Sequence, residues 1–142
     1  MVSAVTRTTM SRYAAWPAVC ALLALAGCAG QGSVEDEPAA QTAERFAASV
    51  TSDPRAACAL LAPQTRVELE GEHGPCPQSL PQQDVPEDAG SVREVKVYGK
   101  DAVAYLERDT VFLARFDDGW RVTAAGCTPN GDQPYDCDVE GS

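Results

Sequence analysis

Cysteine is the most abundant chemically reactive residue type for its rarity in proteins, since this chain has six cysteines and a single histidine in 142 residues. A thiol can form a disulfide, hold a metal, act as a nucleophile or carry a lipid. Cys20 lies within an apolar N-terminal stretch, and five cysteines follow it. An odd number of cysteines in an exported chain predicts that one is free or modified. We expect that residue to be Cys28.

The residues before Cys28 have the composition of an export signal. Arg7 and Arg12 are the charged residues of this stretch. Residues 14–26 form an apolar run that is too short for a membrane-spanning helix, which needs about 20 such residues. The sequence therefore predicts that residues 1–27 are a signal peptide.

The leader ends in Leu25-Ala26-Gly27-Cys28, which resembles the lipobox of bacterial lipoproteins. In that class of protein a peptidase cuts before the cysteine, whose thiol carries a diacylglyceryl group. The resemblance implies that Cys28 is lipidated and that membrane lipid holds the chain on the outer face of the cell membrane. The alternative is an ordinary secretory signal that happens to end at Cys28. Residues 28–37 are expected to be the lipidated cysteine and a flexible tether.

The chain that follows the leader is strongly acidic. Because Arg7 and Arg12 precede Cys28, the remainder has nine basic and 21 acidic side chains and a net charge of −12. This charge repels phosphate, so nucleic acid is excluded as a partner. It also disfavours adhesion to anionic lipid through a basic face. Contact with the membrane must therefore come from the lipid on Cys28.

Residues 38–142 are expected to form one domain with helices first and strands after them. Helical spacing of apolar residues predicts a helix over 38–51, Asp53-Pro54 predicts the start of a second helix, and residues 64–70 predict a third. Residues 71–90 are rich in Gly and Pro and are expected to be irregular. Strands joined by short turns are predicted over 92–98, 102–107, 110–116 and 120–125. The sequence therefore predicts an α+β domain whose helices pack on one face of a curved, antiparallel, four-stranded meander.

Several segments of this domain resemble the NTF2-like (SnoaL-like, cystatin-like) superfamily, and small actinobacterial lipoproteins in particular. The segments that carry the resemblance are 56–63, 110–116, 119–122, 124–127 and 134–137. The resemblance spans residues 38–142 and implies a cone in which a helix plugs the curved sheet. It implies little about activity, because this fold hosts enzymes and inert modules alike.

Four cysteines remain in the domain, and they allow three pairings. We favour Cys58–Cys76, which would tie the second helix to the Gly- and Pro-rich segment, and Cys127–Cys137, which would close a C-terminal loop. Each bond is worth about 3 kcal/mol in the chain-entropy model, and such bonds suit a small exported domain. The rival interpretation is a zinc site formed by Cys58, His73 and Cys76. No Cys-x-x-Cys pair is present to support it, so we expect no metal.

Acidic residues alternate near the C-terminus at Asp136, Asp138 and Glu140. A calcium site is one interpretation of this pattern, but the segment lacks the glycine and the acid spacing of an EF-hand loop. We expect a solvated acidic tail instead.

The aromatic residues of the predicted strands are the candidate pocket. Tyr98, Tyr105, Phe112 and Trp120 either line the mouth of the cone, where they would bind a small apolar ligand, or fill the core. Related folds perform isomerase or dehydratase chemistry with a tyrosine and buried carboxylates, so an enzyme acting on a small hydrophobic substrate is the alternative function. The predicted strands contain no acid within an apolar stretch, and the isolated His73 suggests no catalytic triad.

We therefore expect no catalytic residues and no cofactor. The predicted function is that of a non-catalytic binding or accessory module. Its partners would be membrane lipid through Cys28 and an envelope or membrane protein, or a small apolar ligand.

Replacing Cys28 tests the lipid anchor. Cys28→Ala removes the atom that would carry the lipid, so the full-length variant should lose labelling by a fatty acid and should stay uncut or leave the membrane fraction. Wild-type protein that washes from membranes with high salt alone would contradict the anchor.

Overall fold

The computed structural model describes residues 31–141, so the leader, Cys28 and its neighbours lie outside the described residues. The described part is α+β, with helices preceding an antiparallel sheet. The helices are α1 (Gln31–Ser49), α2 (Pro54–Leu60), α3 (Pro63–His73), α4 (Cys76–Ser79) and the 3-10 helix η1 (Leu80–Gln82). The strands are β1 (Val92–Tyr98), β2 (Asp101–Leu106), β3 (Thr110–Phe116), β4 (Gly119–Asn130) and β5 (Gln133–Glu140). Among the described residues, no helix is long and apolar enough to cross a membrane.

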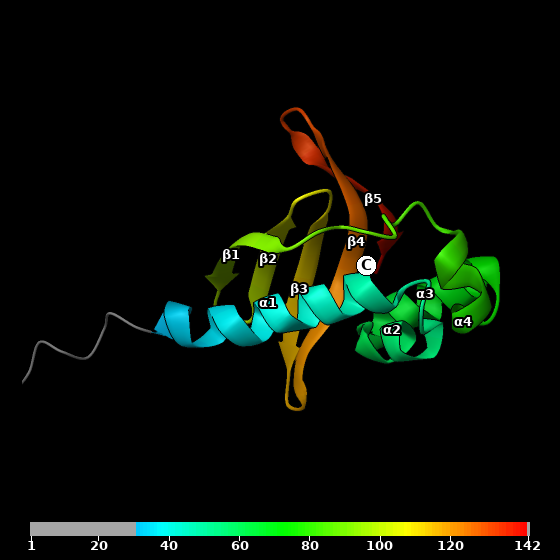
Figure 1. Ribbon diagram of the computed structural model, residues 1–142, viewed down its shortest axis with the longest axis horizontal. Helices are drawn as coiled ribbons and strands as arrows, with labels where there is room; N and C mark the ends of the chain where they lie inside the picture. The colour runs from blue at the N-terminus through cyan, green and yellow to red at the C-terminus, as the bar shows by residue number, and fades with distance from the viewer. Residues whose placement is uncertain (1–30, 142) are drawn as a thin grey trace, which may run out of the picture.

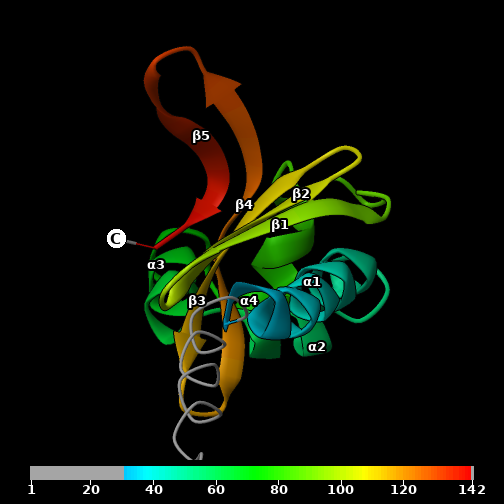
Figure 2. The same ribbon diagram turned by 90° about the vertical axis from the view of Figure 1, so that its left-hand side faces the viewer.

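The strands follow one another in the sheet in the order of the sequence, and each pairs antiparallel with the next. Helix α1 lies across one face of this meander, while α2, α3 and α4 gather at one end of it (Figure 1). Turned by 90°, the molecule shows the β4–β5 hairpin projecting beyond the other strands (Figure 2). The predicted α+β class and the antiparallel meander are thus confirmed.

The core lies between α1 and the sheet face that it covers. Ala39, Ala43, Phe46 and Val50 form a stripe at helical spacing on α1, and each is at most 1% exposed. The strands contribute fully buried side chains such as Val111, Leu113 and Val122. Burial of a side chain of the size of Phe or Leu contributes about 1.5–3 kcal/mol, so this contact is what holds the helix to the sheet.

The start of α1 corrects the prediction of a tether up to residue 37. The helix begins at Gln31 instead of Pro38, so Pro38 lies inside it. A proline inside a helix removes one hydrogen bond, which disfavours the helix locally by about 3 kcal/mol. Tertiary contacts oppose that cost, because the side chain of Glu35 binds to strands β3 and β4. The sequence pattern around Pro38 contained no sign of these partners.

Strand β5 corrects the prediction of four strands and a C-terminal loop. Asn130 pairs with Gln133 across a two-residue turn, in which Gly131 has a φ of +60°. The two turn residues are Gly131 and Asp132, and a Gly-Asp pair between two strands is a common hairpin signal. Cys127 and Cys137 pair directly across the two strands and are joined by a disulfide. Val139 is 1% exposed and anchors β5 in the core.

Strand β4 is irregular where it meets the helices. Its pairing with β3 shifts by one residue beside Phe112, a bulge that turns backbone groups away from the regular ladder. The N–H of Ala62 donates to Val122 O at 2.7 Å. The carbonyl of Thr123 accepts from Thr65 Oγ1 at 3.1 Å and from the N–H of Gly141 at 3.0 Å. A Cβ on Gly141 would lie 2.5 Å from Thr65 Oγ1, so this approach requires glycine.

Asp109 ties the turn between β2 and β3 to the same strand. Its carboxylate accepts backbone N–H bonds from Thr110 at 2.7 Å, Gly126 at 3.2 Å and Cys127 at 3.0 Å. Among residues 34–141 it is the one buried ionisable side chain, at 7% exposure. Burial raises the pKa of Asp109, the three amides oppose that rise, and nearby Asp138 adds to it. No local sequence pattern identified Asp109 as a buried acid.

Asp109→Asn should lower the free energy of unfolding by about 1–3 kcal/mol, because an amide oxygen cannot replace both carboxylate oxygens as acceptors. The raised pKa means that the folded protein holds the proton more tightly than the unfolded chain, so the contribution of Asp109 to stability declines as pH rises through that pKa. The deficit of the variant relative to wild type should therefore shrink as the pH rises above the ordinary pKa range of an aspartate. Urea unfolding at several pH values measures it, and a deficit that grows with pH would contradict the sign.

Candidate functional site

The structure contains both disulfides of the predicted pairing. Cys58–Cys76 joins α2 to the start of α4 across 18 residues, and Cys127–Cys137 joins β4 to β5 across 10 residues. The first disulfide holds the helical end of the molecule together, because Cys58 and Cys76 are both buried. The second fixes a hairpin and not a loop.

The predicted aromatic pocket does not form, because its members lie on opposite faces of the sheet. Trp120 lies on the face covered by α1 and is 5% exposed. Strand alternation places Phe112 on the other face, where its ring contacts Tyr135 edge-on at a centroid distance of 5.2 Å. Tyr105 lies under Lys96 Nζ at 5.2 Å, and burial raises the pKa of its hydroxyl. Tyr98 is 64% exposed.

Trp120 instead takes part in a polar contact with the start of α1. It is the cross-strand neighbour of Arg115, and both side chains bind Glu35. The indole N–H of Trp120 donates to Glu35 Oε2 at 3.1 Å, and Arg115 Nη1 lies 2.7 Å from Glu35 Oε1. The two oxygens of one carboxylate therefore each have their own donor from the sheet.

This contact forms one wall of a hollow of about 490 Å³ between α1 and the β3–β4 hairpin. Three arginines line it, Arg45 from α1 and Arg115 and Arg121 from the hairpin, together with Trp120 and Leu60. We call it the arginine hollow. A chain with a net charge of −10 thus brings three of its 11 basic side chains to one concave place.

A second hollow, of about 420 Å³, lies beside the first between the hairpin and α3. Its lining includes Leu61, Pro63, Val67 and Phe116, and we call it the apolar hollow. Val67 is 62% exposed and Phe116 is 40% exposed. Large apolar side chains left in contact with water within a concave surface are typical of a binding site.

Arg121 separates the two hollows and lines both of them, as does Asp118. The guanidinium of Arg121 donates to the carbonyl of Ala59 and to the carboxylate of Asp118. The hydrogen bond from Arg121 lowers the pKa of Asp118. Together the two hollows form one surface, which we call the hairpin groove.

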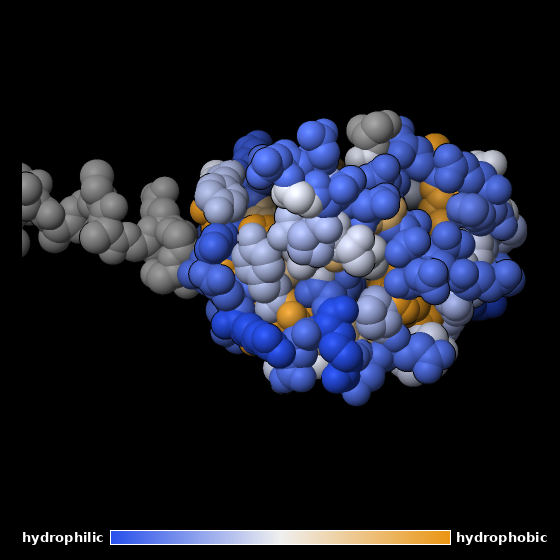
Figure 3. All heavy atoms as spheres, turned by 90° about the horizontal axis from the view of Figure 1, so that it is seen from above, coloured by the Kyte–Doolittle hydropathy of each residue, from blue (hydrophilic) through white to orange (hydrophobic). Residues whose placement is uncertain are grey.

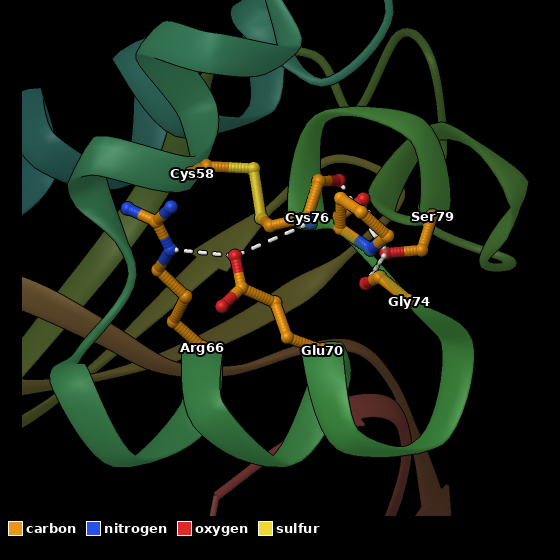
Figure 4. A network of polar contacts seen from close by, with 7 residues as sticks. Cys58, Arg66, Glu70, Gly74, Cys76 and Ser79 are labelled. Carbon is orange, nitrogen blue, oxygen red and sulfur yellow. Dashed lines mark hydrogen bonds and ion pairs between the residues drawn. A yellow bond between two sulfur atoms is a disulfide. The ribbon is translucent and has the colours of Figure 1, made fainter.

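A network of polar contacts and one disulfide joins α2, α3 and α4 on the α3 side of the hairpin groove (Figure 4). Arg66 Nε lies 2.9 Å from Glu70 Oε1, which also accepts the N–H of Cys76 at 3.3 Å. These contacts lower the pKa of Glu70, with the bond from Arg66 the largest cause. The hydroxyl of Ser79 donates to Gly74 O at 3.1 Å and so joins α4 to the end of α3. Next to them, the Cys58–Cys76 disulfide holds α2 in place.

The other acidic and histidine candidates do not assemble into a site. His73 is exposed at the end of α3 and lies 3.6 Å from Glu72. Asp136, Asp138 and Glu140 are exposed as predicted, although they stand on a strand and not in a tail. No group of three or more metal-ligating side chains occurs among the described residues.

A further hollow, of about 380 Å³, lies between α1 and the segment before β1. Two of its three carboxylates, those of Glu44 and Asp88, bind other parts of the fold. Glu44 accepts the N–H of Val92 at 3.1 Å, and Asp88 pairs with Arg108 at 2.5 Å. The end of the molecule seen in Figure 3 is predominantly hydrophilic, with hydrophobic areas that are small and separate. The hairpin groove therefore combines charge and apolar area in a way that these other surfaces do not.

Sequence reasoning missed the groove, although one signal for part of it was available. Arg115 alternates with Val111 and Leu113 along β3, so it shares their inward face. A charged side chain that projects from the core face of a strand is stabilised by an opposite charge nearby, and Arg115 is 48% exposed at the edge of that face. No sequence pattern identified that partner as Glu35.

Trp120→Ala should lower the free energy of unfolding by about 3–5 kcal/mol, because it leaves a cavity beneath α1. Trp120→Phe retains much of the buried ring and loses the hydrogen bond to Glu35, so its effect should be smaller. Chemical denaturation of both variants measures the difference. Unchanged stability of Trp120→Ala would show that the indole does not pack in the core.

Comparison with known proteins does not assign this chain to a family. No family model, no curated protein and no solved structure matches it. The geometry of the hairpin groove is therefore the basis for assigning a function.

Proposed function

We propose that this protein is a lipid-anchored module on the outer face of the cell membrane, which binds an envelope partner through the hairpin groove. The observation that carries the binding function is the groove itself, where exposed Phe116 and Val67 adjoin the arginine hollow. Aromatic and arginine side chains are the residue types most enriched in the energetic centres of protein interfaces.

The location rests on the cysteines. The order of basic start, apolar run and Leu25-Ala26-Gly27-Cys28 supports lipidation of Cys28. The two disulfides support a compartment in which thiols are oxidised. An NTF2-like domain remains part of this proposal, since it is an α+β fold with helices packed on an antiparallel sheet.

The anchor would also position the groove. Two residues, Ala29 and Gly30, lie between Cys28 and the start of α1 at Gln31, so the Cα atoms of Cys28 and Gln31 are at most about 11 Å apart. Glu35 lies one helical turn further, about 6 Å along the axis. The arginine hollow would therefore lie close to the membrane surface, where the exposed part of a membrane protein is within reach.

A photo-crosslinking residue at Val67 in intact cells tests this proposal. Val67 is exposed beside Phe116, so it should yield one discrete protein adduct, and Phe116→Ser should reduce that adduct by removing apolar contact area. Lys100, exposed in the turn between β1 and β2, is the matched control position and should give no such adduct. Equal adducts from both positions would show that the groove is not the binding surface.

A further inference from the structure

We propose that the arginine hollow binds a carboxylate group of an external ligand, and that Glu35 occupies the donors of that site until the ligand displaces it. The inference rests on the proposed function of the hairpin groove as a binding surface and adds the chemical class of what it binds. It does not depend on the lipid anchor.

The first support is that the structure already contains a carboxylate site. Arg115 and Trp120 are cross-strand neighbours, and each donates to a different oxygen of Glu35, at 2.7 Å and 3.1 Å. A charged guanidinium and an indole N–H fixed by the sheet form a rigid pair of donors. The side chain of Glu35 is 21% exposed, so the site is open to solvent at its edge.

The second support is that Glu35 lies in a segment whose described side chains, those of residues 34–38, are mostly exposed. Val34 is 70% exposed, and Glu37 and Pro38 are also exposed. Pro38 cannot donate the hydrogen bond that would close the helical turn around Glu35. The first turns of α1 therefore separate from the sheet at a small cost in buried area. Such a segment is a suitable internal competitor, because a ligand does not have to unfold the core to replace it.

The third support is the charge that Glu35 leaves unmatched. Arg45 is exposed, and its guanidinium contacts Gln41 O at 3.3 Å and Thr42 Oγ1 at 3.5 Å. Within residues 34–141 it has no carboxylate within ion-pair distance. A ligand with more than one carboxylate would engage both Arg115 and Arg45. The hollow of about 490 Å³ has the size of a small-molecule site.

Citrate is the probe that matches this chemistry, and inorganic phosphate is the comparison anion. The chain has two tryptophans, Trp16 and Trp120, so Trp16→Phe in the full-length protein makes tryptophan fluorescence report on the hollow alone. Both anions are titrated at constant ionic strength. Citrate should change the emission of Trp120, and phosphate should bind at least about tenfold more weakly because it has no second anionic group to reach Arg45 while the first is bound to Arg115.

Glu35→Gln should strengthen citrate binding by about tenfold or more, because a neutral amide competes less well for Arg115. Arg45→Gln should weaken binding by about tenfold, in wild type as well as in the Glu35→Gln background. Arg55→Gln on α2 is the matched control, since Arg55 is exposed and lies outside the lining of the hollow. Arg45→Gln keeps the test decisive even where Glu35→Gln fails to fold, because Arg45 is exposed and makes no ion pair within the described residues.

Three results would overturn the inference. They are no citrate response in wild type or Glu35→Gln, equal binding of phosphate and citrate, and an equal effect of Arg45→Gln and Arg55→Gln. A discrete adduct at Val67 without citrate binding would support the groove as a partner-binding surface and would contradict the carboxylate site. Citrate binding without any adduct would support the carboxylate site and would contradict the groove as a partner-binding surface.

Discussion

Strand β4 is the part of the molecule on which the rest of the structure depends, because its backbone needs partners that the sheet alone does not provide. Its pairing register shifts once against β3 and once against β5, and a buried peptide group without a partner costs free energy comparable to a lost hydrogen bond. Val122 and Thr123 receive donors from the α2–α3 connection, from Thr65 and from the C-terminus. Gly126 and Cys127 donate to Asp109. Segments far apart in the sequence are thereby fixed to one strand.

At another place on the sheet, it is a charged side chain and not a peptide group that needs a partner. Arg115 stands on the face that α1 covers, and Glu35 balances its charge while also accepting from Trp120. Paired charges near a protein surface contribute modestly to stability. The contact explains why α1 continues on the N-terminal side of Pro38, which local propensity disfavours. It also builds one wall of the hairpin groove, so the feature that orders the helix is the feature that shapes the candidate site.

The hairpin groove combines a cross-linked frame with exposed apolar side chains. The helices beside it are fixed by the Cys58–Cys76 disulfide and by the Arg66–Glu70–Cys76 contacts. Val67 and Phe116, in contrast, are exposed to solvent. A rigid frame with exposed apolar side chains loses little conformational freedom when it binds a partner. That arrangement suits a docking surface. Because Cys28 lies only a short distance before α1 in the sequence, anchor and groove would act at the same end of the molecule.

The sequence by itself determined the α+β class, three of the helices and the first four strands of the meander. These features depend on local patterns, such as the Asp53 cap, which accepts the N–H of Ala56 at 3.2 Å, and the alternation in β1. Only the tertiary structure decided that α1 extends back to Gln31 and that the acidic C-terminal segment is a strand. Both depend on partners remote in sequence, Glu35 with Arg115 and Cys127 with Cys137. The aromatic pocket failed for a related reason: alternation assigns Phe112 and Trp120 to a face, but only register and helix packing decide which face is covered and which side chains meet.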